Sequence, residues 1–191
     1  MKYKWIRSNI YSIKFIISFA LIALIIGFVL FNNESNVIKD GVLNSIKDLD
    51  INIINSRENV FLIHLGLVSI FIVLSIIVIG MPIFLIYYFY EFVSIGYLLS
   101  VFFSYKKFNG LLFGVVFTCI NKMLFLVILS YFLINMINYT RKYINSIKLN
   151  KNDLIINYLY KCFFVILLVI INDLFLYFLG NKLTSIFLFL I

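Results

Sequence analysis

The sequence predicts an all-α fold, a polytopic integral membrane helix bundle with five transmembrane helices and one extracytoplasmic amphipathic helix. Composition is the first reason, because the 191 residues are 64% hydrophobic and only 13% charged, with a mean hydropathy of +1.10. The second reason is an apolar block from Val60 to Phe103, roughly twice the ~20 residues that one helix needs to cross a bilayer. A water-soluble fold could not bury so much continuous apolar surface, whereas a bilayer accepts it when helices satisfy the backbone hydrogen bonds.

The N-terminal segment predicts a retained membrane anchor. Residues 1–14 carry four basic residues, and residues 15–31 follow as an uninterrupted apolar run, the first predicted span. A secretory signal peptide would have a shorter apolar region and would end in small residues at a cleavage site. The sequence Phe31-Asn32-Asn33 offers no such site.

The next segment is polar and predicts an amphipathic helix over residues 37–54. Its apolar residues recur at helical spacing: Val42, Ile46, Leu49 and Ile53. We expect this helix to lie on the bilayer surface or on the other spans, since an apolar stripe beside a membrane usually faces lipid or protein. The alternative is a docking face for an extracytoplasmic partner.

Four further spans are predicted, over residues 60–79, 83–103, 111–138 and 162–180, within a single domain of residues 1–191. Gly80 and Pro82 separate the first two, and these residue types mark the turn of a hairpin. With a cytoplasmic N-terminus, this order places nine Lys or Arg residues inside and six outside, as the positive-inside rule favours. If Gly80 to Pro82 were only a kink, the excess of basic residues would lie outside.

Three ionisable residues fall inside predicted spans: Glu91, Lys122 and Asp173. Each would cost about 2.5–3.5 kcal/mol alone at a helix centre, so we expect them to find partners. Positions 91 and 122 are equidistant from a turn at Lys106 and Lys107, so antiparallel spans would bring Glu91 and Lys122 to the same depth near the midplane. Asp173 either joins them or faces a polar interior. We favour a structural pair over an ion or proton pathway, which needs a longer polar lining or broken helices.

Small residues predict close helix contacts. Gly110 and Gly114 form a GxxxG pattern, and Gly96 with Ser100 repeats this spacing one span earlier. His64 is the single histidine, near the outer end of its span, and is interpreted as interfacial rather than as a metal ligand.

The sequence also excludes several classes of function. It contains no nucleophile with its base, no phosphate-binding glycine loop and no metal-ligand cluster, so we expect neither an enzyme nor a cofactor. The basic residues gather in the membrane-flanking loops, which is typical of membrane topology and not of nucleic-acid binding.

A longer pattern resembles a known family. It consists of four segments: Gly80-Met81-Pro82-Ile83-Phe84-Leu85-Ile86, then Phe89, then Ile95-Gly96-Tyr97, then Gly110-Leu111-Leu112-Phe113-Gly114. This pattern is similar to the centre of the stage II sporulation protein M (SpoIIM) family, and the likeness covers roughly residues 76–129. The chain departs from the family at Phe92-Val93, where Gly-Phe is usual, and at Ile120-Asn121-Lys122, where Pro-x-Asn is frequent.

The resemblance implies a non-catalytic membrane scaffold of endospore formation. Such a scaffold would act with the peptidoglycan-degrading sporulation proteins D and P at the septum during engulfment, in the bacterial cell membrane, and the family offers no catalytic residue to carry over. The alternative from the residues alone is a small ion-coupled membrane permease that uses Glu91, Lys122 and Asp173.

Overall fold

The computed structural model of the chain describes residues 2–47, 58–77, 79–145, 151–180, 182 and 186, and these ranges contain helices and turns but no strand. The elements are α1 (Lys2–Asn32), α2 (Asn36–Lys47), α4 (Glu58–Ile76), α5 (Gly80–Thr118), the π-helix η1 (Cys119–Met123), α6 (Leu124–Asn145), α7 (Lys151–Phe175) and the π-helix η2 (Leu176–Gly180). The predicted all-α class is confirmed.

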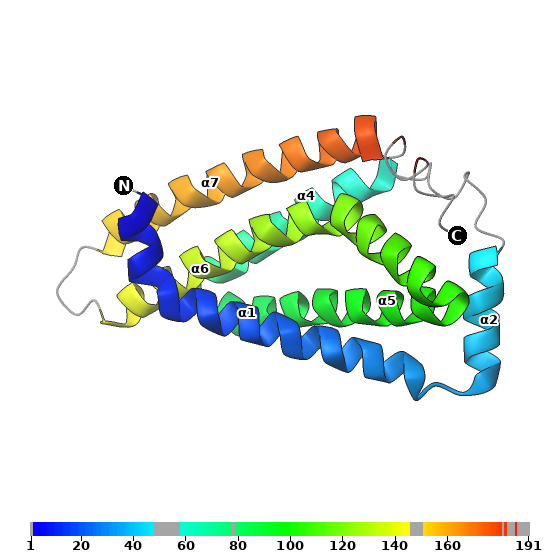
Figure 1. The fold of residues 1–191 in the computed structure, drawn as a ribbon. Coiled ribbons are helices and arrows are strands. Elements are labelled where there is room, and N and C mark those ends of the chain that lie inside the picture. The colour runs from blue at the N-terminus through cyan, green and yellow to red at the C-terminus, as the bar shows by residue number, and fades with distance from the viewer. Residues whose placement is uncertain are drawn as a thin grey trace.

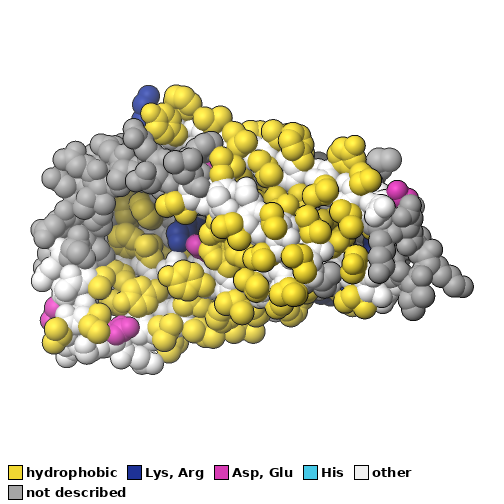
Figure 2. Space-filling model, turned by 180° about the vertical axis from the view of Figure 1, so that it is seen from behind, with side chains coloured by type: hydrophobic (Ala, Val, Ile, Leu, Met, Phe, Trp, Pro, Cys, Tyr) yellow, Lys and Arg dark blue, Asp and Glu magenta, His cyan; other side chains and the backbone are white. Residues whose placement is uncertain are grey.

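Three of the described helical segments are long and apolar enough to cross a membrane: Asn9–Asn32, Gly80–Asn145 and Asn152–Gly180. A shorter apolar helix covers Ile63–Ile76. Hydrophobic side chains also cover much of the outer surface, as Figure 2 shows for one face. Exposed apolar surface of this extent suits a lipid environment, so the helices indicate a membrane-associated protein.

The helices lie nearly alongside one another, with α2 across one end of the molecule (Figure 1). α1 packs along α5, α7 packs on α4 and α6, and α4 also contacts α5. Aromatic and aliphatic side chains fill the space between them, including the fully buried Phe84, Phe132 and Val169. The ring of Phe84 meets that of Phe132 edge-on, with centroids 5.0 Å apart.

The 66-residue apolar segment Gly80–Asn145 is not one straight helix. Within it, α5 turns back on itself at the predicted turn, Lys106 and Lys107 (Figure 1). Their backbone angles leave the helical region, with φ −130° and ψ 27° at Lys106 and φ 48° and ψ −123° at Lys107. Gly110 allows the two arms to approach closely, since a Cβ built on it would collide with the carbonyl oxygen of Phe102. Gly114 is also tightly packed, because a Cβ built on it would lie 3.0 Å from the Phe102 ring.

Lys107→Gly is expected to stabilise the protein by about 1 kcal/mol. Lys107 has a positive φ, which costs a residue with a Cβ about 1–3 kcal/mol, whereas glycine adopts it freely. Equilibrium unfolding in mild detergent with increasing sodium dodecyl sulfate measures the change. The neighbouring Lys106→Gly is the control and should be neutral or destabilising, because Lys106 has a negative φ. Equal changes in stability at both positions would contradict the expectation that the positive φ of Lys107 is strained.

The first hairpin differs in detail from the prediction. α4 ends at Ile76 and α5 begins at Gly80, so Gly80, Met81 and Pro82 form the first turn of α5 rather than the corner itself. Proline fits the first helical turn, where its missing N–H costs no hydrogen bond. A Cβ on Gly80 would overlap the backbone of Leu74 and Ser75, so this glycine lets α5 begin tightly against the end of α4.

The helices also extend beyond several predicted spans. α1 begins at Lys2, and the region predicted as a connection between the last two spans is helical up to Asn145 and again from Lys151. Span predictions follow hydropathy, whereas a helix continues into polar sequence as long as its backbone bonds are made. α2 begins one residue before the predicted amphipathic helix and covers its residues 37–47, and residues 48–54 lie outside the described residues.

α1 and α5 pack in close contact. A Cβ on Gly96 would collide with the carbonyl oxygen of Leu24, and one on Gly27 would collide with that of Val93. The hydroxyl of Ser100 also faces α1, 3.5 Å from Oδ1 of Asn32. The small residues of α5 therefore pack against α1, and Gly27 completes the contact from the other side.

Candidate functional site

A helix break lies at the centre of the candidate site. The predicted span over residues 111–138 is interrupted by η1, and Figure 1 shows the chain changing direction between α5 and α6. Side chains on this stretch bind carbonyl groups of the preceding turn: Thr118 Oγ1 donates to Val115 O at 3.0 Å, and Asn121 Nδ2 donates to Phe117 O at 2.8 Å. Such bonds bend helices, and π-helical turns often mark functional sites.

The first polar cluster joins this break to the first arm of α5. Lys122, within η1, lies with Nζ 3.1 Å from Oε2 of Glu91 and donates to Ser94 Oγ at 2.9 Å. Tyr87 OH donates to Oε1 of Glu91 at 2.9 Å. Both carboxylate oxygens are therefore bound, and the two residues equidistant from the Lys106 and Lys107 turn are in contact. The Glu91 side chain is 17% exposed and that of Lys122 is 40% exposed.

The second polar cluster joins α4 to α7. His64 Nδ1 lies 2.8 Å from Oδ1 of Asp173, and Asn172 Nδ2 donates to the same oxygen at 3.0 Å. The His64 ring stacks on Phe125, which follows η1, with centroids 4.0 Å apart. Asp173 thus has His64 as its ionisable neighbour, and the His64 side chain is 18% exposed and packs inside the bundle. The depth of His64 near the membrane interface stays a prediction.

A sequence signal for this second cluster existed. α4 and α7 run in opposite directions (Figure 1). His64 lies near the start of α4, and Asp173 lies near the end of the helical segment that stops at Gly180. Because the two helices are antiparallel and both residues lie toward the same end of the bundle, His64 and Asp173 come to similar depths.

The second cluster keeps unused acceptor capacity. Asp173 Oδ2 and Asn172 Oδ1 are buried without a hydrogen-bond partner in the structure. Across the residues described, no group of three or more His, Cys, Asp and Glu side chains is arranged to hold a metal ion.

The described helices define an all-helical, membrane-associated protein with two polar clusters, one at η1 and the other between α4 and α7. Comparison of the chain with protein-family models, curated proteins and solved structures gave no match. All the residues that carry the resemblance to the SpoIIM family lie in α5.

Proposed function

We propose that this chain is a non-catalytic membrane scaffold of endospore formation, resembling SpoIIM, that recruits the sporulation proteins D and P to the septum. The observation that carries the proposal is the position of the four glycines in the resembling pattern. Gly80, Gly96, Gly110 and Gly114 all lie where an added Cβ would meet a neighbour at 3.0 Å or less. This supports a shared packing scheme, because the pattern coincides with residues that set the geometry of α5.

The proposed topology has five membrane crossings and a cytoplasmic N-terminus. In Figure 1 the start of α1, the α4 to α5 reversal and the end of α6 lie at one end of the molecule, and the Lys106 and Lys107 turn lies at the other. The basic residues of the sequence favour the first end as the cytoplasmic one. α4 is included as a fifth crossing because it contains the apolar helix Ile63–Ile76.

The recruiting surface in this proposal is α2. Val37 and Ile38 are 83% and 48% exposed on this short helix outside the apolar spans. A scaffold anchored in the membrane raises the local concentration of any partner that it holds, without chemistry of its own. An exposed apolar pair on the outer side suits contact with another membrane-anchored protein.

Localisation in starved cells tests the scaffold. A fluorescent fusion of the full chain should gather at the division septum together with a wall hydrolase of engulfment. Val37→Glu should leave the fusion at the septum but remove the hydrolase, whereas Asn157→Glu, an exposed position on α7, should remove neither. An even distribution over the membrane at all stages would contradict the proposal.

A second candidate, a small ion-coupled permease, is favoured by the broken helix at η1 and the buried pair of His64 with Asp173. Transporters place ion sites at interrupted helices within the membrane. In reconstituted vesicles, Glu91→Gln or Asp173→Asn should then abolish a proton-driven or cation-driven flux that the unaltered chain supports. Absence of any such flux from the unaltered chain would end this candidate.

A further inference from the structure

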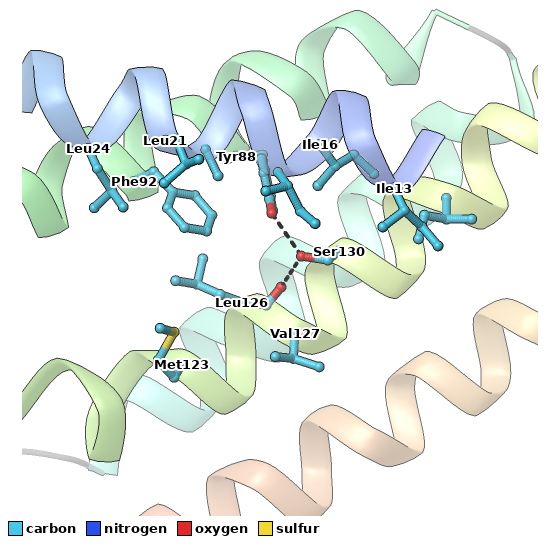
Figure 3. Close-up of a pocket in the computed structure, with 13 residues that line it drawn as sticks. Ile13, Ile16, Leu21, Leu24, Tyr88, Phe92, Met123, Leu126, Val127 and Ser130 are labelled. Atoms are coloured by element: carbon cyan, nitrogen blue, oxygen red, sulfur yellow. Dashed lines mark hydrogen bonds between the residues drawn. The ribbon is translucent and has the colours of Figure 1, made fainter. Parts of the chain in front are cut away.

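A groove runs between α1, α5, η1 and α6, and none of its lining residues belongs to either polar cluster. Its volume is about 280 Å³, and thirteen side chains line it. Figure 3 shows side chains of α1 and α6 facing one another, with Tyr88 and Phe92 of α5 between them. The rim is open, since the lining residues Ile17, Leu21 and Val127 are 54%, 54% and 64% exposed.

The chemistry of the lining selects a hydrocarbon occupant. Eleven of the thirteen side chains are apolar, and the two others are hydroxyls that bind each other. Ser130 Oγ donates its proton to Leu126 O at 2.7 Å, so Tyr88 OH is the donor in its 2.8 Å bond to Ser130 (Figure 3). The groove therefore lacks a strong hydrogen-bonding group that is free for a polar ligand, and its walls suit an aliphatic chain.

One end of the groove is strongly basic. Ile13 lines it beside the exposed Lys14, and Ile134 lines it about 10 Å along α6 from the exposed Arg141 and Lys142. Asn138 Nδ2 donates to Asn9 Oδ1 at 2.7 Å and holds α1 against α6 at this end. The sequence has no Asp or Glu in residues 1–33 or 124–152, so no nearby acid on these helices offsets the positive charge.

We propose that this groove binds one acyl chain of an anionic phospholipid, with the phosphate group held at the basic end. An apolar groove with three cations beyond one end matches the two parts of such a lipid, and basic residues near the membrane surface attract anionic headgroups. The proposal needs only that α1, α5 and α6 lie in a bilayer, so it is independent of the scaffold role.

Two matched tryptophan reporters test it in bilayers of phosphatidylcholine. In the full chain with Trp5→Phe, Ile17→Trp places the fluorophore on the rim of the groove, and Ile22→Trp places it outside the groove. Both isoleucines are 54% exposed, and only Ile17 lines the groove. Phosphatidylglycerol with brominated acyl chains, which quench tryptophan fluorescence on contact, is added in increasing fractions. A parallel titration with brominated phosphatidylcholine corrects the quenching of each reporter for its depth in the bilayer.

The rim reporter should be half-quenched at a phosphatidylglycerol fraction at least fivefold lower than brominated phosphatidylcholine requires, while the outer reporter should respond equally to both lipids. Replacing Lys14, Arg141 and Lys142 by Gln should abolish this preference and bring the two curves of the rim reporter together, because basic residues near the membrane surface attract anionic headgroups. The same replacement of Lys39, Lys106 and Lys107, which lie away from the groove, should leave the preference intact.

Equal quenching of the rim reporter by the two lipids would overturn the proposal. A preference that survives the loss of the three cations at the groove, or that disappears equally in the control triple, would also overturn it. Both triples alter exposed positions, apart from the half-buried Lys39 of the control triple. Intrinsic fluorescence of the outer reporter verifies that each variant is folded.

Discussion

Gly96→Ala is expected to lower the free energy of unfolding by about 2–3 kcal/mol, the upper range for overpacking a well-packed contact. The added Cβ would collide with the carbonyl oxygen of Leu24, and its next contact would be Leu24 carbon at 2.9 Å. Backbone atoms cannot rotate away as a side-chain end can, so α1 must move off α5. Unfolding in mild detergent with increasing sodium dodecyl sulfate measures the loss.

Gly66→Ala is the matched control, because it makes the same substitution within a helix of the same chain. Nothing lies within 4 Å of a Cβ built on Gly66. Alanine is the better helix former by about 1 kcal/mol, so this variant should be neutral or more stable. If the two variants had the same stability, the close contact between α1 and α5 would be refuted.

Breaking the pair of Glu91 and Lys122 should cost about 3 kcal/mol from either side, since removal of one partner leaves an uncompensated charge. Glu91→Gln deprives Lys122 Nζ of its 3.1 Å contact, and Lys122→Met leaves the carboxylate with only Tyr87. The double variant should be less destabilised than the sum of the two single variants, with a coupling energy of about 1–3 kcal/mol.

Exchange of the two residues then separates a structural pair from a transport site. Glu91→Lys combined with Lys122→Glu restores the attraction but reverses its direction and loses the bonds from Tyr87 and to Ser94. A structural pair should recover most of the lost stability, whereas a directional carrier would remain inactive in vesicles. Additive single effects, with no coupling energy, would contradict the ion pair itself.

Sequence reasoning succeeded where one physical rule was sufficient. Hydropathy predicted the all-helical, apolar character of the chain, because a run of apolar residues leaves the backbone few alternatives in lipid. Equal spacing from Lys106 and Lys107 predicted the contact between Glu91 and Lys122, because residues equidistant from a hairpin turn lie at the same depth when both arms have the same rise per residue. Both inferences depend on local pattern and on one turn.

Other features required knowledge of the neighbouring helices. The π-helix at Cys119–Met123 arises where Thr118 and Asn121 bind backbone carbonyls, and such polar residues also occur in ordinary helices. Gly27 lies in an apolar run without a second glycine at the GxxxG spacing, and its role appears only when Val93 is placed against it. Asp173 needed the antiparallel relation of α4 and α7 to reveal His64 as its neighbour.

The proposed five-span topology is tested most directly by single cysteines at the two ends of the bundle. In a chain with Cys119→Ser and Cys162→Ser, cysteine replaces Ile79, Lys106 or Lys142, all of them exposed positions. A membrane-impermeant maleimide added to intact cells should label the Lys106→Cys variant alone, and the other two variants should react only after permeabilisation. Labelling of the Ile79→Cys and Lys106→Cys variants from the same side would contradict the account.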